Sequence, residues 1–378
     1  MLEVTDAPSF ALSLALEQAQ IARVGCSPNP AVGCIIVDTH GKEIGSGHTQ
    51  VVGGPHAEIM ALRDASARGS DVRGSTVFVT LEPCSHHGRT GPCCDALIDA
   101  GIKRVVAFQT DPNPRVSGQG FARLRAAGVE VDVLPSTDPL AVEARELNLG
   151  FFSRMIRKRP WVRAKMAITL DGKTALPDGT SQWITSQEAR ADGHSWRARS
   201  CAMLTGIGTV LSDDPRLDVR EIATTRQPQL VIIDAFLQTP INAALFESPR
   251  KVLIYTANPL PSAQQALASR GATVVHLPDT SMPNHVDLGA VMFDLGQLEV
   301  NELHVECGRG LTGSLLQARL VDDLLLYVAP KLLGPGKDMA NLAAATTLSD
   351  ALPLDYRSFD RIGPDLRIVA RLRDRDHF

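Results

Sequence analysis

Residues 81–101 read LEPCSHHGRTGPCCDALIDAG, a stretch that places three cysteines within eleven residues and beside two histidines. An apolar, β-branched run at 75–80 precedes it, and the apolar spacing of residues 93–100 predicts a helix at its end. The stretch therefore connects a strand to a helix. Thiols gathered in such a connection are typical of a soft-metal site.

The strand-to-helix alternation continues on both sides of this connection. We predict strands at 31–37, 75–80, 104–108 and 129–133, and helices at 9–21, 56–67, 93–100 and 121–127, the last with Gly128 as its C-cap. Strands and helices that alternate in this way predict an α/β fold, in which a sheet is covered by helices.

The length of 378 residues favours two domains over one core. A basic run ends at Pro160, and a new set of strands follows it, so we place the boundary near residue 150, between domains 1–150 and 151–378. In the second domain we predict strands near 162–169, 202–205, 229–234, 251–256, 273–276, 302–306 and 323–329, and loops at 259–265 and 277–285.

Composition excludes several classes of partner. Apolar residues make up 44% of the chain, charged residues 21%, and the net charge is −4, so nothing attracts nucleic acid or anionic lipid in general. No apolar run approaches the roughly 20 residues that span a bilayer, and the N-terminus lacks a basic leader. An odd number of cysteines, seven, suits a reducing compartment. We expect a soluble cytoplasmic protein.

A metal site can be assembled from two parts of the first domain. The segment PHAEIMAL (55–62) puts His56 at the start of a helix, and Cys84 and Cys93 flank the connection quoted above. One histidine and two cysteines suit zinc, and three protein ligands leave the fourth position open, as in catalytic sites. If His56 occupies the cap or first turn, Glu58 can reach the same site and move protons, which predicts hydrolytic deamination.

A structural zinc site is the alternative, with His86 or Cys94 as a fourth ligand. Cys94 would point about 100° away from Cys93 on a helix, which favours a core position for it. A solvated loop position is the plainer interpretation of His87.

The second domain carries a glycine-rich strand-to-helix connection. Gly308, Gly310 and Gly313 fit the pattern G-x-G-x-x-G, which presents backbone N–H groups to a phosphate. A Rossmann site also needs an acid at the end of the next strand, but the segment DDLLLYVAPK (322–331) carries its acids at its start. A phosphate cradle therefore remains, without the Rossmann interpretation.

The motifs PHAE and PCSHHGRTGPC resemble the deaminase half of the bifunctional riboflavin-biosynthesis deaminase/reductase family. The segments LDGKTA (170–175), SQWIT (181–185) and TGIGTVLSDDPRLDVR (205–220) resemble its reductase half, so the resemblance covers almost the whole chain. It implies a cytidine-deaminase-like, three-layer N-terminal domain and a dihydrofolate-reductase-like C-terminal domain, with Zn²⁺ and NADPH as cofactors.

The resemblance also implies roles for individual residues. The zinc ligands are His56, Cys84 and Cys93, Glu58 is the proton shuttle, and Asn29 flanks the pyrimidine. Contacts to the nicotinamide cofactor fall on Ala167, Trp183, Thr209, Asp213, Gly308, Arg309, Gly310, Leu311, Thr312, Gly313 and Ser314. Contacts to the sugar phosphate fall on Ser181, Arg197, Leu217, Arg220 and Glu306, and Lys165 is a candidate for polarising the carbon that accepts hydride. The sequence CGRGL and Ala235 depart from the family pattern.

The implied activity is hydrolytic deamination of 2,5-diamino-6-ribosylamino-4(3H)-pyrimidinone 5′-phosphate, followed by NADPH-dependent reduction of the ribosyl chain to ribityl. The partner is thus a small phosphoribosyl pyrimidine, without nucleic acid or membrane. One rival is a zinc deaminase of another nucleotide with a nucleotide-binding, non-reducing second domain. Another is a non-enzymatic protein with structural zinc. Apolar edge strands make a homo-oligomer an expectation.

Overall fold

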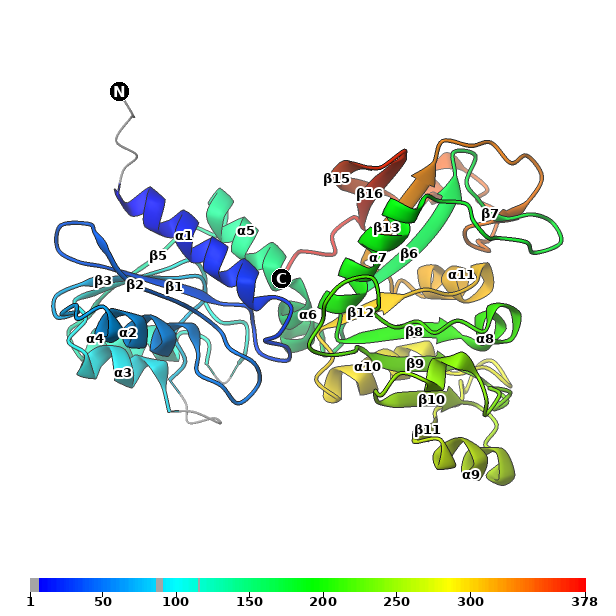
Figure 1. The fold of residues 1–378 in the computed structure, drawn as a ribbon, viewed down its shortest axis with the longest axis horizontal. Coiled ribbons are helices and arrows are strands. Elements are labelled where there is room, and N and C mark those ends of the chain that lie inside the picture. The colour runs from blue at the N-terminus through cyan, green and yellow to red at the C-terminus, as the bar shows by residue number, and fades with distance from the viewer. Residues whose placement is uncertain (1–6, 86–90, 115) are drawn as a thin grey trace. The chain divides into compact units, whose positions relative to one another are not determined.

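The computed structural model describes residues 7–85, 91–114 and 116–378. The chain forms two compact units, Met1–Arg157 and Lys158–Phe378 (Figure 1). The boundary expected near residue 150 falls inside helix α6 (Leu149–Arg157). The two units divide after this helix because its side chains Phe151 and Phe152 pack into the core of the first unit.

The first unit is built on a five-stranded sheet of order β2-β1-β3-β4-β5. Its strands are β1 (Gly33–Val37), β2 (Glu43–His48), β3 (Thr76–Val79), β4 (Arg104–Ala107) and β5 (Glu130–Val133), and its helices before α6 are α1 (Ala7–Ala22), α2 (Ala57–Ala67), α3 (Cys93–Asp99), α4 (Gln119–Ala126) and α5 (Pro139–Leu147). Strand β1 is antiparallel to β2 and β3, while β3, β4 and β5 run parallel.

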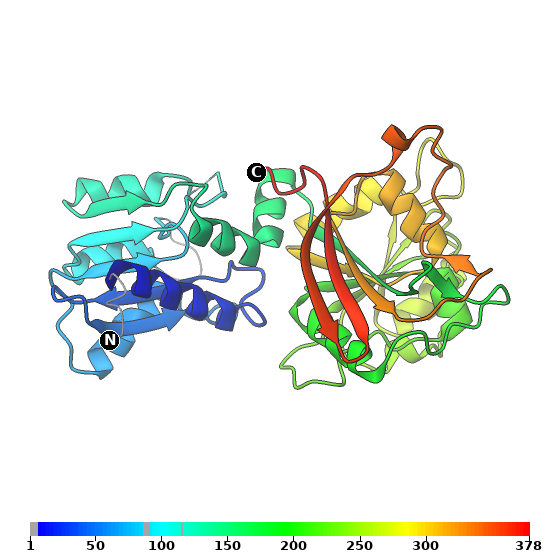
Figure 2. The same cartoon turned by 90° about the horizontal axis from the view of Figure 1, so that it is seen from above.

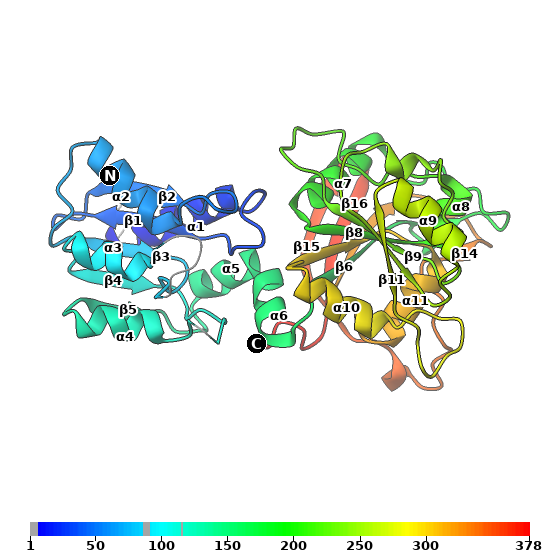
Figure 3. The same ribbon diagram turned by 90° about the horizontal axis from the view of Figure 1, so that it is seen from below.

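Side-chain alternation along β1 explains the three layers of this unit. Cys34 and Ile36 point into a core shared with α2, α3 and α4, whereas Ile35 and Val37 point into a second core shared with α1 and α5. Helices therefore cover both faces of the sheet, as Figure 1 shows, and Figure 3 looks onto the face that carries α2, α3 and α4. The three-layer fold expected from the sequence is confirmed.

All four strands predicted for the first unit are present, and Gly128 takes a φ of +84° after α4, as a helix terminator does. Strand β2 was not predicted, because its sequence EIGSGH has weak strand character. Its glycines are needed where they stand: a Cβ on Gly47 would lie 2.4 Å from the backbone nitrogen of Ala61 in α2. Helix α2 thus packs directly on the backbone of β2.

The second unit is built on a nine-stranded sheet of order β11-β10-β9-β8-β12-β6-β13-β16-β15, with a separate two-stranded sheet of β14 and β7. The strands are β6 (Trp161–Thr169), β7 (Lys173–Ala175), β8 (Ala202–Gly206), β9 (Gln229–Ile233), β10 (Val252–Thr256), β11 (Ala272–His276), β12 (Glu302–Val305), β13 (Asp323–Ala329), β14 (Lys337–Asp338), β15 (Leu354–Ile362) and β16 (Asp365–Leu372). The α-helices are α7 (Gln187–Arg199), α8 (Ile207–Asp213), α9 (Pro261–Ser269), α10 (Leu288–Gln297) and α11 (Arg309–Gln317), and the 3₁₀ turns are η1 (Ala244–Phe246) and η2 (Leu348–Asp350).

At the central strand β6, one face of the sheet is apolar and the other is polar. Its residues Val162, Ala164 and Met166 join the core beneath α10 and α11. The alternate residues, Arg163 among them, face α7, where the guanidinium of Arg163 lies 4.7 Å from the ring centre of Trp196. The polar face is the one that carries most of the residues expected to bind the sugar phosphate.

One prediction for the second unit is wrong, and one hairpin was missed. The predicted loop 259–265 is wrong from residue 261 onward, because α9 begins at Pro261, a residue that suits the first turn of a helix. The C-terminal hairpin of β15 and β16, which is red in Figure 2, was not predicted, since the bulge between Tyr356 and Ser358 interrupts the alternation of apolar and polar residues along β15. Within the described residues, no helix has the length and apolar character needed to cross a membrane.

Candidate active sites

The first candidate site is formed by the starts of helices α2 and α3 and by the connection after strand β3. His56 is the N-cap of α2, in an extended conformation with φ −76° and ψ 169°, and its carbonyl accepts a hydrogen bond from the Met60 N–H. Cys84 lies in the connection after β3, and Cys93 is the first residue of α3. The condition set for Glu58, that His56 occupy the cap or first turn, is therefore met.

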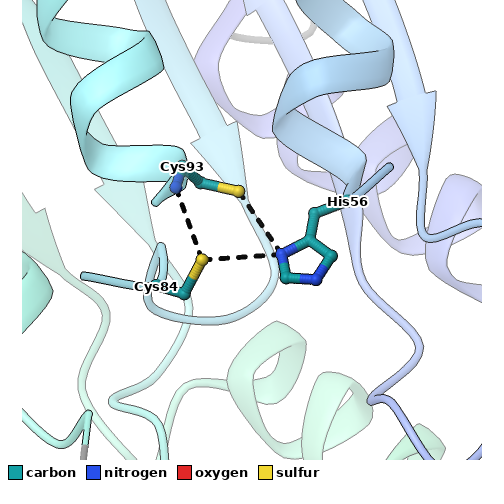
Figure 4. Close-up of side chains that lie close together, drawn as sticks. All are labelled: His56, Cys84 and Cys93. Atoms are coloured by element: carbon teal, nitrogen blue, oxygen red, sulfur yellow. Dashed lines mark hydrogen bonds between the residues drawn. The ribbon is translucent and has the colours of Figure 1, made fainter. Parts of the chain in front are cut away.

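The three predicted ligands converge (Figure 4). Nδ1 of His56 lies 3.5 Å from Sγ of Cys84 and 3.4 Å from Sγ of Cys93. Around a tetrahedral zinc ion, a nitrogen and a sulfur ligand stand roughly 3.6 Å apart, given Zn–N of about 2.0–2.1 Å and Zn–S of about 2.3 Å. The cluster therefore fits zinc, with Nδ1 rather than Nε2 as the histidine ligand.

Backbone and thiol donors hold the Cys84 loop in place. The N–H of Cys93 donates to Sγ of Cys84 at 3.4 Å, and the N–H of Cys94 donates to the Cys84 carbonyl at 3.2 Å. The Cys94 thiol itself donates to the carbonyls of Pro83 and Gly120. Cys94 thus fixes the position of Cys84 through these hydrogen bonds. Among the described residues, Cys94 is not part of the ligand cluster. His86 and His87 lie outside the described residues.

The contact between Cys84 and Cys93 shifts the pKa values of the two thiols in opposite directions. The pKa of Cys84 is lowered to about 4, because its sulfur accepts hydrogen bonds from the Cys93 thiol and from His56. The same contact with Cys84, together with burial, raises the pKa of Cys93. A thiolate and a thiol therefore share one proton beside an imidazole. A divalent cation can displace that proton and bind all three side chains.

Glu58 is buried against this cluster, with 3% of its surface exposed. Burial, and then the negative charge of Cys84, raise the pKa of Glu58 to about 7. A carboxyl group with such a pKa can both accept and release a proton near neutral pH, as a proton shuttle must. Asn29 is half-buried in the turn after Pro28, where its N–H donates to the Cys26 carbonyl, and within the described residues it makes no hydrogen bond to the cluster.

The second candidate site is centred on Glu306, just after β12. Arg197 of α7 donates through Nε to Oε1 at 2.7 Å and through Nη2 to Oε2 at 2.9 Å, a bidentate pair. Nζ of Lys165 in β6 lies 3.8 Å from Oε2. Burial opposes ionisation of Glu306, but Arg197 and Lys165 hold its pKa well below its usual range. Burial lowers the pKa of Lys165 despite the nearby carboxylate.

Other residues expected at the sugar phosphate join this centre through Asp218. Nη1 of Arg197 donates to the Asp218 carbonyl, and Nη1 of Arg220 donates to Oδ1 of Asp218 at 2.7 Å. Leu217, next to Asp218, is buried and has a φ of +50°. Ser181 is half-buried in the segment before α7, and the structure does not bring it into this hydrogen-bonded group of described residues.

The residues expected at the cofactor lie in α8, in the first turns of α11, on β6 and in the connection before α7. Gly308 is the N-cap of α11, and a Cβ placed on it would lie 3.8 Å from Oγ1 of Thr209 in α8. Arg309, Gly310 and Leu311 form the first turn of α11, whose N–H groups have no partner within the helix. The segment 308–314 is thus largely a helix N-terminus, not a free loop.

The remaining cofactor candidates differ in exposure. Gly313 is a packing glycine: a Cβ there would lie 2.2 Å from the carbonyl oxygen of Asn341. Thr312 is buried and Ser314 exposed. Ala167 lies half-buried on β6, and Asp213 ends α8 on the surface. Trp183 is 63% exposed, with the guanidinium of Arg190 lying 4.3 Å from its ring centre.

Two residues of the second site were missed in the sequence. Asp218, 3% exposed, also accepts from Ser248 and Arg216, and His304 is fully buried next to Glu306. The signal for His304 was its position two residues before Glu306 in a strand, which places both side chains on the same face.

Two family models match the chain. The "cytidine and deoxycytidylate deaminase zinc-binding region" matches residues 6–109, and the "RibD C-terminal domain" matches residues 160–368. The riboflavin biosynthesis protein RibD of Escherichia coli K12 is 42% identical, over 94% of this chain and 97% of that protein. Its counterpart in Haemophilus influenzae is 37% identical over 98% of each.

Solved structures agree with these matches. Acinetobacter baumannii RibD, form 1, aligns with a TM-score of 0.86 and 35% identity, over 97% of this chain and 99% of that one. A diaminohydroxyphosphoribosylaminopyrimidine deaminase/5-amino-6-(5-phosphoribosylamino)uracil reductase from Thermotoga maritima aligns with a TM-score of 0.84 and 31% identity, over 97% and 99%. The chain belongs to the RibD family of riboflavin-biosynthesis enzymes, with a zinc-dependent deaminase as its first unit and an NADPH-dependent reductase as its second.

Proposed function

We propose that the first unit hydrolyses the 2-amino group of 2,5-diamino-6-ribosylamino-4(3H)-pyrimidinone 5′-phosphate. The second unit then reduces the ribosyl chain of the product, 5-amino-6-(5-phosphoribosylamino)uracil, to ribityl. The observation that carries the proposal is the burial of Glu58 against the cluster of His56, Cys84 and Cys93, in a chain that also holds a reductase unit. The similar protein from Thermotoga maritima is named for both activities, deaminase and reductase.

In the deaminase unit, His56, Cys84 and Cys93 hold the zinc ion. Zinc supplies a Lewis acid that activates a water molecule at neutral pH. Glu58 accepts a proton from the attacking water and passes it to the leaving amine, so that ammonia departs and a carbonyl remains on the ring. Its raised pKa suits both transfers. Asn29 is assigned to the rim of the pyrimidine site.

In the reductase unit, NADPH supplies the hydride. The cofactor contacts are assigned to Ala167, Trp183, Thr209, Asp213 and the helix start Gly308, Arg309, Gly310, Leu311, Thr312, Gly313 and Ser314. The N–H groups in the first turn of α11, which have no partner within the helix, suit a phosphate of the dinucleotide.

The sugar phosphate is assigned to Ser181, Arg197, Leu217, Arg220 and Glu306. Arg197 and Arg220 carry the positive charge for the phosphate, and the Glu306 carboxylate accepts hydrogen bonds from ribose hydroxyls. Lys165 is assigned to polarise the carbon that accepts hydride, and its position near Glu306 and above the ring of Tyr327 supports this assignment.

A coupled assay tests this proposal. Purified protein of known zinc content is given the diaminopyrimidine nucleotide and NADPH, and ammonia release and NADPH loss are followed together. Equal amounts of both are expected. Ammonia without NADPH loss would contradict the reductase assignment, and neither signal with zinc bound would contradict the proposed substrate.

Compartment and assembly are part of the same proposal. None of the seven cysteines, all of them among the described residues, is part of a disulfide, which suits the reducing cytoplasm. Strand β15 is an edge strand of the large sheet and exposes Tyr356 and Phe359, a surface suited to pairing with a second copy. Light scattering on the purified chain should then give at least twice the monomer mass of 40.6 kDa; a monomer would contradict the assembly.

A further inference from the structure

His304 occupies an unusual place for a histidine, in the middle of the nine-stranded sheet. Strand β12 lies between β8 and β6, and His304 pairs with Met203 on one side and Arg163 on the other. Its neighbours Leu303 and Val305 point into the apolar core. The imidazole therefore points to the opposite, polar face, where its exposed fraction is 0%.

The imidazole lies against Glu306 without completing a hydrogen bond. Nε2 of His304 is 3.3 Å from Oε1 of Glu306. In the part of the chain that the structure describes, neither ring nitrogen meets the geometry of a hydrogen bond. Burial of an unpaired polar group is unfavourable, so a fully buried imidazole that stops just short of a carboxylate calls for a functional reason.

The other partners of Glu306 suggest that reason. In this structure Arg197 donates to both carboxylate oxygens, and Lys165 lies near Oε2. Arg197 is also assigned to the sugar phosphate. If Arg197 turns toward a phosphate, both carboxylate oxygens lose a donor, and Oε1 is the oxygen that lies 3.3 Å from Nε2 of His304.

We propose that His304 is a positioning residue of the reductase, whose Nε2–H donates to Oε1 of Glu306 and fixes the carboxylate toward the ribose hydroxyls. The proposal rests on the assigned contact between Glu306 and the sugar. Hydrogen bonds in catalytic sites are often loose before substrate binds and tighten in the complex, which agrees with the 3.3 Å separation.

The charge state of His304 supports this role. Burial lowers the pKa of His304, Glu306 raises it, and Arg197 and Arg163 lower it again, with a net lowering. The ring is therefore neutral at pH 7. A neutral N–H can orient the carboxylate without competing with Arg197 and Lys165 for its charge. The role requires the tautomer in which Nε2 carries the proton.

Site-directed variants of the full-length chain test the proposal. H304L replaces the imidazole with an apolar side chain that cannot donate a hydrogen bond, while H304Q keeps an N–H donor. V305A is the matched control, since Val305 is the next residue in β12 but points into the apolar core. For each variant we would measure kcat, the KM for 5-amino-6-(5-phosphoribosylamino)uracil, the KM for NADPH and the thermal midpoint by circular dichroism.

We expect H304L to raise the KM for the sugar substrate about tenfold or more, the effect of one lost hydrogen bond to a charged group, while the KM for NADPH is unchanged. H304Q should recover most of the loss. V305A should lower the thermal midpoint and leave both KM values unchanged. A wild-type KM in folded H304L, or an equal rise in both KM values, would overturn the proposal.

The variant E306Q separates this proposal from the one it rests on. If E306Q and H304L both raise the KM and the double variant H304L/E306Q is no worse than E306Q, His304 acts through Glu306. If E306Q alone is defective, the role of His304 is overturned and the assignment of Glu306 stands. If E306Q has a wild-type KM, the assignment of Glu306 fails.

A second measurement applies even if H304L does not fold. The ¹⁵N chemical shifts of histidine-labelled protein, with the His304 signals identified by their loss in H304Q, report the tautomer directly. Protonation at Nε2 agrees with donation to Glu306, whereas protonation at Nδ1 alone would overturn the proposal.

Discussion

Glu58 is the residue on which we propose that deamination depends most, because it is buried against the cluster of His56, Cys84 and Cys93 without belonging to it. The variant E58Q keeps the size of the side chain and removes its ability to carry a proton. We expect full zinc content and a fall in ammonia release of about 10²–10⁴-fold, the usual contribution of a positioned proton carrier. The exposed pair of Glu43 with Arg68 offers a control, since E43Q should leave both unchanged. Deamination by E58Q at the wild-type rate would contradict the assignment.

At the level of residues, the sequence predicted which side chains could form a metal site better than it predicted which atoms contact one another. His56, Cys84 and Cys93 were found because few roles suit those residue types at that spacing. The choice of Nδ1 as the ligand atom, and the support that Cys94 gives to the Pro83 carbonyl, depend on how two helix starts face each other. His304 was missed because the strand around it is apolar, although its position two residues before Glu306 places both side chains on the same face of the sheet.

At the level of elements, the polar face of the large sheet holds a buried network of charges. Arg163 of β6 donates to Glu302 of β12 at 2.8 Å and lies 3.4 Å from Asp323 of β13, so it joins three adjacent strands. R163M would leave two buried carboxylates short of a partner. We expect a loss of about 3–5 kcal/mol in the free energy of unfolding, measured by denaturant titration.

The control for R163M is R373M, because the pair of Arg373 and Asp355 is about half exposed on both sides. Such a pair contributes about 0–1 kcal/mol. Equal effects of the two substitutions would contradict a structural role for the buried network.

Elements with strong periodicity were predicted well, and the failures have physical causes. Strand β2 was missed because Gly45 and Gly47 are selected by the approach of α2, not by strand propensity. Helix α9 begins inside a predicted loop because its first residue is a proline, which is equally common in turns. In both places tertiary packing or a cap position, which local sequence does not show, decides the conformation.

At the level of the whole molecule, the two units have separate cores, and the zinc cluster belongs to the first alone. Removal of zinc by a chelator should therefore abolish ammonia release. NADPH-dependent reduction of 5-amino-6-(5-phosphoribosylamino)uracil, supplied directly, should continue at an unchanged rate. Added Zn²⁺ should restore the first activity. Loss of both activities on chelation would contradict the independence of the units.

The tryptophans and tyrosines are confined to one unit, whereas phenylalanines lie in both. All three tryptophans, Trp161, Trp183 and Trp196, and all three tyrosines lie in the second unit. Intrinsic fluorescence of the full chain therefore reports on the reductase unit alone, without any label or truncation. Since NADPH absorbs where tryptophan emits, and Trp183 is exposed at the assigned cofactor site, quenching of that emission gives a direct optical titration of cofactor binding.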